Sequence, residues 1–599
     1  MHSRYPTPRS AALLLALALS AASAAEPRYD VLDLRTLGFS DAFALNNLGH
    51  VAGRNESGEV LLWNGSTVSS TSLDSATPAI MDLNDLGSIV GTYTDPSLGE
   101  DFAFVLTAGE LTKLQGFDVA SAINNRGQIV LNSFGGSADA FIYQNGTSVA
   151  LGSLGGTDTF PAAINTSGAV VGGSTPVAGS EHQHAFLYHN GSTTDLGTLG
   201  GQRSSANDIN DAGNIVGHSY GNTEEFQAVI YTVGRALPLI PHQPGTNSSG
   251  LKINNYNVIA GHLPLAGIWS GGVLKLLADF ADFESFGVRP AIADFNDRGQ
   301  ILVRGWMRDP IMRSIPLLLT PRPTPPARLT ALAARSIAGA NDQTSIAGFV
   351  VAGNSNGSIL LRTVGPGLTP LGVTNAAADP AVKIFNSANT VVAANDNWSA
   401  DESAAATLSS TATRLGAQPL AADSADAALL ADLPAGAYTA HASNPADPSR
   451  IVLTEIYDAG DDDARLTAAS IRLHIGTGES IGIVGFALAG EGPAKVLLRA
   501  LGPDLATRGV ANNLADPQLW LYRGSTPVLA NDDWGSADTT PLLASTTTQV
   551  GLSALPDASK DAALLVQLEP GAYTLHVSGT NNSTGIALVE VYLVPDTAP

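Results

Sequence analysis

The sequence predicts an all-β protein, a seven-bladed β-propeller followed by two tandem β-sandwich domains. Three observations lead to this prediction. An Asn-x-x-Gly block recurs at a nearly constant spacing through the first half of the chain. Each repeat also contains an aromatic apolar run and a Gly-rich end, and the second half of the chain is internally duplicated. Periods near 40 residues are typical of one small β-sheet packed against copies of itself.

The repeated block contains an asparagine, then x-x-Gly, then two or three apolar residues. Its asparagines are 38 to 45 residues apart and are Asn46, Asn84, Asn124, Asn165, Asn210, Asn254 and Asn296. Asn at the first position and Gly at the fourth favour a type I turn, because the Asn side chain caps the turn and Gly accepts positive φ. The block therefore predicts a hairpin, with Asn and Gly as turn formers.

Two further strands are expected after each hairpin. The third strand carries an aromatic residue, as in Ala185-Phe186-Leu187-Tyr188, and Asn190-Gly191 marks the turn after it. The fourth strand includes Asp195-Leu196-Gly197 and runs into glycines. Four strands per unit of about 40 residues is the arithmetic of a propeller blade, so the seven asparagines predict seven blades.

The two ends of the array predict how the ring closes. Residues 29–38 match the fourth strand of a unit. The seventh unit has a third strand at Ile315 to Leu319 and then reaches Pro321 without a fourth. The first strand is therefore expected to complete the last blade, which removes open sheet edges. A β-solenoid is the alternative, but its coils have shorter periods and need end caps.

The repeats also resemble a known family. His184-Ala185-Phe186-Leu187-Tyr188, together with residues 195–201, resembles the signature of the HAF family of bacterial extracellular repeat proteins. The resemblance covers residues 28–320, and in other repeats Asp101 or Asp139 replaces the histidine. It implies export and a propeller-like array, and it implies no settled activity or ligand.

The first 25 residues are expected to be a secretory signal peptide. Arg4 and Arg9 form a positive segment, residues 11–21 are apolar, and Ala22-Ser23-Ala24 fits a cleavage site. No later run reaches about 18 apolar residues, so no membrane span is expected. We therefore expect a secreted protein, in the extracellular medium or the periplasm. The resemblance to the HAF family implies that it is bacterial.

Composition narrows the classes of function. The net charge of −24 at pH 7 disfavours nucleic acid as a partner. The chain has no cysteine, which excludes thiolate catalysis, Cys-based metal sites and disulfides. Stability must then come from burial between repeats.

The second half of the chain begins after a Pro-rich linker at residues 321–327. Beyond it the sequence duplicates with a period of about 136 residues, and short alternating apolar runs predict a β-sandwich in each copy. The expected modules are residues 328–458 and 465–593, joined by an acidic linker at 459–464. Matching pairs include Leu361-Arg362 with Leu498-Arg499, Asp426 with Asp561, and Glu455-Ile456-Tyr457 with Glu590-Val591-Tyr592.

The two copies are similar to bacterial pre-peptidase C-terminal-type sandwiches. The similarity lies in the Asn-Asp-x-Trp turn and in the strand start Glu569-Pro570-Gly571-Ala572-Tyr573-Thr574. It implies an accessory module of the kind that accompanies secreted hydrolases and binding proteins.

Candidate metal ligands lie at the matching turns of the two copies. They are Asn395, Asp396, Asn397, Asn531, Asp532 and Asp533. Such oxygens suit Ca²⁺, which takes about 6–8 of them. Because the other ligands are not identified, we favour the alternative that these side chains cap their own turns. Trp398 and Trp534 follow these turns as core side chains or, alternatively, as sugar-stacking platforms.

Other patterns predict no catalytic residue. His182 and His184 would face the same side of a strand, but no partner completes a metal site. Gly353 to Gly357 matches G-x-S-x-G, yet it lies between β-like segments, whereas a nucleophile elbow needs a strand-to-helix turn. We interpret this segment as a hairpin turn, and no nucleotide cofactor is expected.

The sequence favours a secreted non-enzymatic binding or scaffold protein that presents propeller loops to an extracellular protein or glycan. The alternative is a secreted carbohydrate-active or other hydrolytic enzyme that uses the propeller funnel, with accessory sandwiches. A surface adhesin is a third hypothesis. Clustered Asp, Glu, Arg or His on one irregular blade of the funnel would favour the enzyme. A funnel lined by Ser, Asn and aliphatic residues would exclude it.

Overall fold

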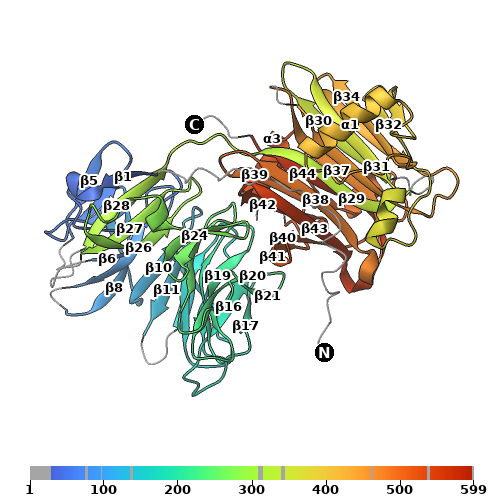
Figure 1. The fold of residues 1–599 in the computed structure, drawn as a ribbon. Coiled ribbons are helices and arrows are strands. Elements are labelled where there is room, and N and C mark those ends of the chain that lie inside the picture. Colours follow the sequence, from blue (N-terminus) through green and yellow to red (C-terminus); the bar gives the residue numbers. More distant parts are fainter. Residues whose placement is uncertain are drawn as a thin grey trace. The chain divides into compact units, whose positions relative to one another are not determined.

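The computed structural model describes residues 29–595 except 74–77, 96–97, 135–138, 308–313, 339–344, 461–462 and 536–539. The expected signal peptide lies outside these residues. The chain divides into two compact units, one ending at Pro323 and the other beginning at Thr324 (Figure 1). No helix within the described ranges combines the length and hydropathy needed to cross a bilayer.

The N-terminal unit is a ring of seven four-stranded antiparallel sheets, so the seven-bladed propeller is confirmed. The first six blades use strands in chain order. They are β2 (Asp41–Leu45), β3 (Val51–Arg54), β4 (Val60–Trp63) and β5 (Val68–Thr71); β6 (Ala79–Leu83), β7 (Ile89–Thr94), β8 (Asp101–Thr107) and β9 (Glu110–Leu114); β10 (Val119–Ile123), β11 (Ile129–Ser133), β12 (Asp139–Gln144) and β13 (Thr147–Ala150); β14 (Thr159–Ile164), β15 (Val170–Ser174), β16 (His184–His189) and β17 (Ser192–Gly197); β18 (Ser204–Ile209), β19 (Ile215–Tyr220), β20 (Phe226–Thr232) and β21 (Arg235–Pro238); β22 (Ser249–Ile253), β23 (Ile259–His262), β24 (Ala266–Ser270) and β25 (Val273–Leu276).

The seventh blade closes the ring as the sequence predicts. It contains β26 (Val288–Phe295), β27 (Ile301–Met307) and β28 (Ser314–Pro321), and β1 (Tyr29–Asp33) pairs antiparallel with β28 from Tyr29↔Pro321 to Asp33↔Leu317. Pro321, expected in the linker, is therefore part of this blade. The strand expected up to residue 38 ends early, because the Asp33 side chain accepts a bond from the Arg35 amide and starts the 3-10 turn η2 (Leu34–Leu37).

Apolar faces pack between neighbouring blades. One cluster joins Ala44 and Val60 of blade one to Ile80 and Phe104 of blade two. A second cluster joins Ala260 and Ile268 of blade six to the seventh blade through the short 3-10 turn η3 (Leu277–Asp279). In it, the Tyr29 and Phe280 rings stack 5.0 Å apart. Burial between blades therefore replaces the single core of a globular domain.

The innermost strand of every blade is irregular at the same place. Two residues before each repeated asparagine the pairing register shifts, for example between Ile80 and Asp82 and between Gly250 and Lys252. The other five blades shift at the equivalent positions. A β-bulge re-aims the side chains next to it, and these side chains lie at the propeller axis.

The two faces of the propeller differ in their connections. In an antiparallel blade, the first and third connections lie on one face, and the second connection and the link to the next blade lie on the other. All seven first connections, such as 46–50 and 210–214, have five residues. We call this the short-turn face. On the opposite, long-loop face the connections range from three residues (263–265) to eleven (277–287).

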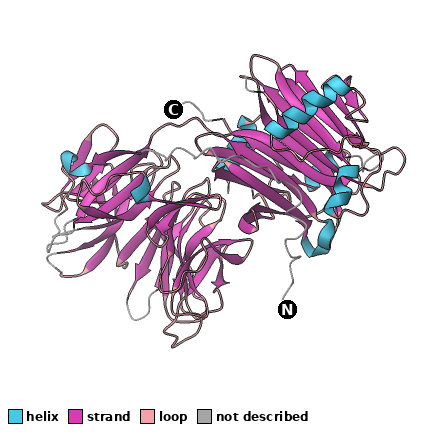
Figure 2. Cartoon of the chain, viewed as in Figure 1, coloured by secondary structure: helices cyan, strands magenta, loops and turns pink. Residues whose placement is uncertain are grey.

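Among the described residues, the C-terminal unit contains two eight-stranded sheets and three α-helices. Figure 2 shows its strands and helices in different colours. One sheet has the order β34-β31-β36-β29-β38-β43-β40-β41 and the other β33-β32-β35-β30-β37-β44-β39-β42. The first copy supplies β29 (Arg328–Ile337), β30 (Ser345–Ala352), β31 (Gly357–Val364), β32 (Ala381–Asn386), β33 (Val391–Asn395), β34 (Ala427–Leu433), β35 (Gly436–Ser443), β36 (Ile451–Asp458), η5 (Pro366–Leu371) and α1 (Glu402–Arg414). The second supplies β37 (Arg465–Ile475), β38 (Gly482–Ala489), β39 (Ala494–Leu501), β40 (Pro517–Arg523), β41 (Thr526–Asn531), β42 (Ala562–Leu568), β43 (Gly571–Gly579), β44 (Gly585–Leu593), η6 (Gly478–Ser480), η7 (Thr580–Asn582), α2 (Pro503–Thr507) and α3 (Pro541–Gln549).

Each sheet takes four strands from each copy, so the two copies do not form separate sheets. The joins are β29 with β38 in one sheet and β30 with β37 in the other. Because β37 and β38 are the repeats of β29 and β30, the two joins are related by the duplication. The expected all-β class is confirmed here, while a separate sandwich in each copy is not.

Ring closure by β1 generates a first prediction. Replacing both Tyr29 and Val31, which pack on the core cluster of the last blade, by Ala should lower the free energy of unfolding of the propeller by about 1–3 kcal/mol. Urea denaturation followed by hydrogen exchange of blade-seven peptides would measure it. Asp30→Ala is the control, because it breaks only the exposed pair with Arg322, which is worth about 0–1 kcal/mol. Equal effects of the two changes would contradict closure by β1.

Candidate functional site

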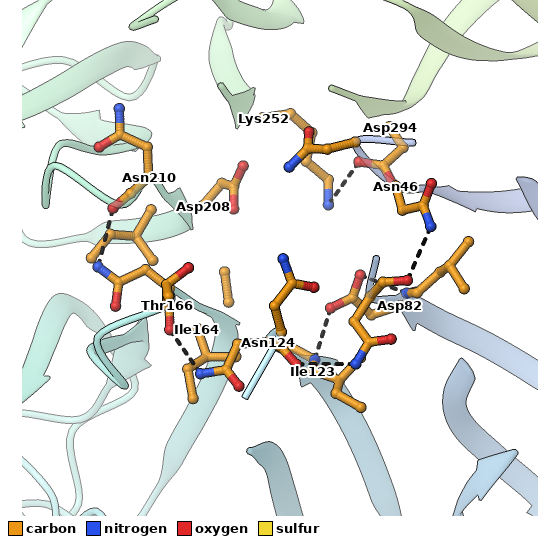
Figure 3. Close-up of a pocket in the computed structure, with 18 of the residues that line it drawn as sticks. Asn46, Asp82, Ile123, Asn124, Ile164, Thr166, Asp208, Asn210, Lys252 and Asp294 are labelled. Atoms are coloured by element: carbon orange, nitrogen blue, oxygen red, sulfur yellow. Dashed lines mark hydrogen bonds and ion pairs between the residues drawn. The ribbon is translucent and has the colours of Figure 1, made fainter. Parts of the chain in front are cut away.

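The repeated asparagines form a closed ring of hydrogen bonds around the propeller axis, and Figure 3 shows part of it. The Nδ2 of each one donates to the backbone carbonyl of the equivalent asparagine in the next blade, at 2.9 to 3.3 Å. The last bond, from Asn296 to Asn46, joins blade seven to blade one at 2.9 Å. All seven residues are at least 95 % buried. The ring therefore stabilises every seam between blades.

The same side chains also cap their own turns. In blade four, the Asn165 Oδ1 accepts bonds from the Ser167 and Ala169 amides at 3.1 and 3.0 Å. The Gly168 amide donates to the Asn165 carbonyl, and Gly168 has φ +88°. The interpretation of Asn and Gly as turn formers is thus correct but incomplete, because it used only the acceptor of the amide side chain.

The next residue in each repeat forms a second layer of bonds between blades. The Oδ1 atoms of Asp85, Asp211 and Asp297 accept backbone amides from the preceding blades at 2.8 to 2.9 Å. Asn255 Nδ2 also bridges the carboxylates of Asp211 and Asp297 at 3.1 and 3.0 Å. Three of the seven positions in this layer therefore carry a carboxylate.

Four charged side chains occupy the bulge positions just before the asparagines. Asp82, Asp208, Lys252 and Asp294 come from blades two, five, six and seven, and Figure 3 shows them lining one cavity. The Lys252 Nζ lies 3.2 Å from the Asp294 Oδ1. Ala44, Ala122 and Ala163 hold the same position in the other blades.

Each of the three bulge carboxylates ties two blades together. The Oδ2 atoms of Asp82, Asp208 and Asp294 accept the backbone amides of Ile123, Ile253 and Leu45 in the following blades, at 2.7 to 2.9 Å. Asp82 and Asp294 also accept an amide from their own blade through Oδ1. Alanine in three blades shows that this tie is not needed at every seam.

Burial shifts the proton affinity of these groups. Desolvation raises the pKa of Asp208 to about 6, against the opposing effect of the Lys252 charge. It also raises the pKa of Asp82, and that of Asp297 to about 6 with help from the nearby Asp211 and Asp85 carboxylates. The Asp294 carboxylate, followed by Asp208 and Asp82, raises the pKa of Lys252. Lys252 is therefore an ammonium ion and not a nucleophilic amine at neutral pH.

The axial cavity is small and polar. Its volume is about 220 Å³, below the roughly 300–1,000 Å³ of typical small-molecule sites. The Lys252 side chain remains 31 % exposed because it faces this cavity, so water screens its charge. We expected charged residues clustered on one blade for an enzyme, or a lining of Ser, Asn and aliphatic residues for a non-enzyme. The funnel fits neither expectation in full. Its charged residues come from four blades, and its carboxylates are already bonded to the backbone.

The candidate calcium residues lie at edge strands of the C-terminal sheets. Asn395 Oδ1 accepts the Ala428 amide at 3.0 Å, and Asn531 Oδ1 accepts the Ala563 amide at 2.9 Å. Each bond joins edge strands of the two different sheets. The Asn side-chain amides also bond the carbonyls of Asn397 and Asp533. The calcium assignment remains a hypothesis for Asp396, Asp532 and the rest of the set. In the part of the chain described, no three His, Asp or Glu side chains converge as a metal site would require.

The two tryptophans after these turns are buried. Trp398 and Trp534 are 9 % and 3 % exposed, and their indole N–H groups donate to the carbonyls of Ala421 and Pro556. Trp398 packs on Leu408 of α1, Tyr457 and Ala487. The core interpretation of these side chains is therefore the one that the structure supports.

The paired histidines have separate partners. His184 Nδ1 lies 2.8 Å from the Asp195 carboxylate, and His182 Nδ1 accepts a bond from Arg203 at 2.8 Å. Residues 353–356 connect β30 to β31, which lie in different sheets. The turn therefore joins two sheets, and the interpretation as a hairpin turn is wrong.

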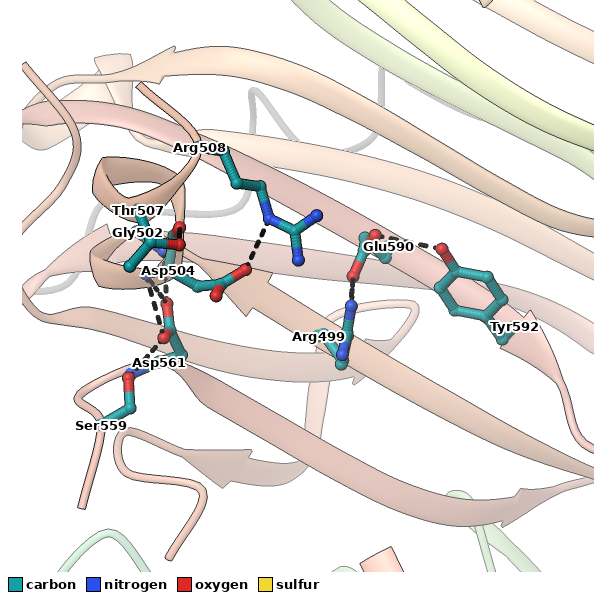
Figure 4. A network of polar contacts seen from close by, with 9 residues as sticks. All are labelled: Arg499, Gly502, Asp504, Thr507, Arg508, Ser559, Asp561, Glu590 and Tyr592. Carbon is teal, nitrogen blue, oxygen red and sulfur yellow. Dashed lines mark hydrogen bonds and ion pairs between the residues drawn. The ribbon is translucent and has the colours of Figure 1, made fainter. Parts of the chain in front are cut away.

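A buried polar network repeats in both copies of the C-terminal unit. Figure 4 shows it in the second copy, where Arg499 contacts Glu590 (Nε to Oε2, 2.7 Å) and the Tyr592 hydroxyl donates to Glu590 at 3.0 Å. The first copy holds Arg362, Glu455 and Tyr457 in the same arrangement. Asp561, like Asp426 in the first copy, accepts amides of the Gly-Pro turn. Each charge meets a partner inside its own copy, so this network supports the fold.

Fold and axis together define a closed seven-bladed β-propeller protein with a duplicated β-unit. Neither a protein-family model nor a curated relative matches the chain. Among solved structures, it is similar to the β-propeller domain of the trilobed protease from Pyrococcus furiosus (14 % identity, 40 % of this chain and 82 % of that one, TM-score 0.31). It is also similar to TolB from Acinetobacter baumannii (13 %, 47 % and 63 %, TM-score 0.27) and to a putative oxidoreductase (glucose dehydrogenase) from Thermus thermophilus (12 %, 49 % and 99 %, TM-score 0.24).

The asparagine ring generates a second prediction. Asn165→Ala removes the bond to Asn210 and the caps of a buried turn, so it should cost about 2–4 kcal/mol of unfolding free energy. Asn64→Ala is the matched control, since Asn64 caps only its own exposed outer turn and its loss should cost about 1 kcal/mol or less. Urea denaturation of both variants would measure the difference. Equal losses would mean that capping, not the ring, is what the repeated asparagines contribute.

The raised carboxylate pKa values generate a third prediction. Because the native Asp208 and Asp297 carboxyls bind protons more tightly than their unfolded forms, with pKa values of about 6 against an ordinary 3.8, they oppose folding at pH 7. That penalty disappears as pH falls through 6 towards 4. The propeller should therefore gain on the order of 1 kcal/mol between pH 7.5 and 5, after allowance for water in the cavity. Thermal denaturation at each pH measures this gain in stability. Asp208→Asn should reduce the gain, and Asp30→Asn is the control. Stability that falls steadily from pH 7.5 to 5 would refute the prediction.

Proposed function

We propose that the chain is a secreted, non-enzymatic binding or scaffold protein that presents the long-loop face of its propeller to an extracellular protein or glycan. One observation carries the proposal. The first connections of all seven blades, on the short-turn face, have five residues each, whereas those of the opposite face vary from three to eleven residues. Surface loops on a rigid scaffold tolerate change and carry recognition.

The chemistry of the axis favours binding over catalysis. Every bulge carboxylate holds a backbone amide of the next blade, and Lys252 is held as a cation by three carboxylates. A general acid or base must be free to exchange its proton with a substrate. In this cavity, proton transfer would come at the expense of bonds that join blades.

Exposed apolar side chains mark contact points on the long-loop face. Leu98, Phe134, Val177 and Leu265, from four blades, are 51 to 63 % exposed there. Leu48 and Leu86 are exposed at the tips of the short turns of two blades. The exposed leucines of the short turns therefore serve as controls for the exposed apolar side chains of the long-loop face.

The test combines binding and turnover. The mature chain would be applied to a glycan array and to a library of secreted proteins, and incubated with chromogenic glycosides. We expect binding without hydrolysis. Phe134→Ser and Val177→Ser should weaken binding by roughly tenfold if these side chains are central anchors, whereas Leu86→Ser should leave it unchanged. Hydrolysis that Asp208→Asn abolishes would instead establish the enzyme alternative.

A further inference from the structure

The seam between blades seven and one carries an unusual set of side chains on the long-loop face. Arg304 of β27 reaches across the seam to Asp41 of β2, with Nε–Oδ1 and Nη2–Oδ2 distances of 3.0 and 2.7 Å. The Asp41 carboxylate is 9 % exposed. This bidentate pair fixes the guanidinium of Arg304 at the seam.

A second guanidinium shares the same carboxylate without bonding it closely. Arg54 Nη2 lies 3.9 Å from Asp41 Oδ2, and the Arg54 side chain is 28 % exposed. Arg289 lies opposite Trp306 in the pairing of β26 with β27 and is also exposed. The Asp41 carboxylate therefore faces two cations, so these three side chains together carry one positive charge in a chain whose net charge is −24.

Aromatic rings hold these cations in place. The Cζ of Arg54 lies 5.2 Å from the centre of the Phe43 ring, and that of Arg304 lies 5.0 Å from Phe43 and 5.3 Å from Trp306. Such cation–π contacts orient a guanidinium without neutralising it. Trp306 itself remains 39 % exposed, so part of the indole is open to a ligand.

A structural tie between blades does not require this chemistry. Arg54 and Arg304 both stand eight residues after the repeated asparagine, where blades two and three have Thr92 and Asn132. Thr92 Oγ1 and Asn132 Nδ2 donate to backbone carbonyls near the start of the following blade, at 3.2 and 3.0 Å. Neutral side chains therefore make the bond between neighbouring blades at those two seams. Two arginines and an exposed tryptophan are not needed for such a bond.

We propose that this seam binds acidic saccharides, with Trp306 as the stacking platform for a pyranose ring and Arg54, with Arg289, as the partners of its carboxylate. The proposal rests on the binding function proposed above and names the ligand class. A flat apolar sugar face matches an indole, and guanidinium groups match a carboxylate bidentately. A free phosphate would lack the face that stacks, and a neutral sugar would leave the guanidinium charge unpaired.

The test is titration calorimetry of the full mature protein with a trigalacturonate. The same trisaccharide with its carboxyl groups reduced to alcohols is the neutral probe. We expect the acidic sugar to bind, the neutral one to bind at least tenfold more weakly, and the affinity to fall with salt, because the charges are partly exposed. Trp306→Leu and Arg54→Gln should each weaken binding by roughly tenfold or more.

Two matched variants control for charge and hydrophobicity. Arg298→Gln makes the same charge change in blade seven on the short-turn face. Leu86→Ala removes an exposed apolar side chain at the tip of a short turn. Both variants should bind as the parent does. Equal thermal midpoints would show that all variants are folded. Absence of binding, equal binding of the neutral probe, or binding unchanged by Trp306→Leu and Arg54→Gln would overturn the seam site. If other ligands still bind through Phe134 and Val177, the general binding function stands even though the seam site fails.

Discussion

The propeller depends on one interaction, the ring of hydrogen bonds between the side-chain amide of each repeated asparagine and the backbone carbonyl of the next. A buried amide that lacked its partner would cost about 1–3 kcal/mol, so each bond constrains the spacing of two blades. Because donor and acceptor belong to the same residue type, the ring closes only when all seven turns adopt one geometry. This explains why the connection after the innermost strand has five residues in every blade.

The ring constrains the short-turn face and the axis of the propeller, but not the long-loop face that we propose for recognition. The first connections and the repeated asparagines are uniform because they build the ring. The axial charges form a second set of ties between blades, balanced around Lys252. The long-loop face is free of the constraint, and its connections differ in length and composition. The seam between the first and last blades differs again, because there a salt bridge between Arg304 and Asp41 replaces the neutral tie used by blades two and three.

The C-terminal unit is also built from repeats, but it has two copies and not seven. Internal duplication repeats the buried Arg–Glu–Tyr network. The sequence showed that its members stand at matching positions, but only the structure showed that they contact one another. How the copies pair could not be inferred in this way. Strands that repeat each other have equivalent edges, so the sequence alone does not indicate whether β29 pairs within its copy or with β38 of the other. The bonds of Asn395 and Asn531 across the edges of the two sheets were likewise not evident from the sequence.

Local patterns in the sequence were sufficient to determine the all-β class, the seven blades and the closing strand. Turn residues and apolar alternation act over a few positions, and the period of the repeat counts the blades. Only the tertiary structure revealed the contacts between residues that are about 40 or 250 positions apart in the sequence. The Nδ2 bonds of the asparagines, the cluster of Asp82, Asp208, Lys252 and Asp294, and the contact of Arg304 with Asp41 are of this kind. Each needs the ring to be closed before its partners are neighbours, so no window of sequence contains it.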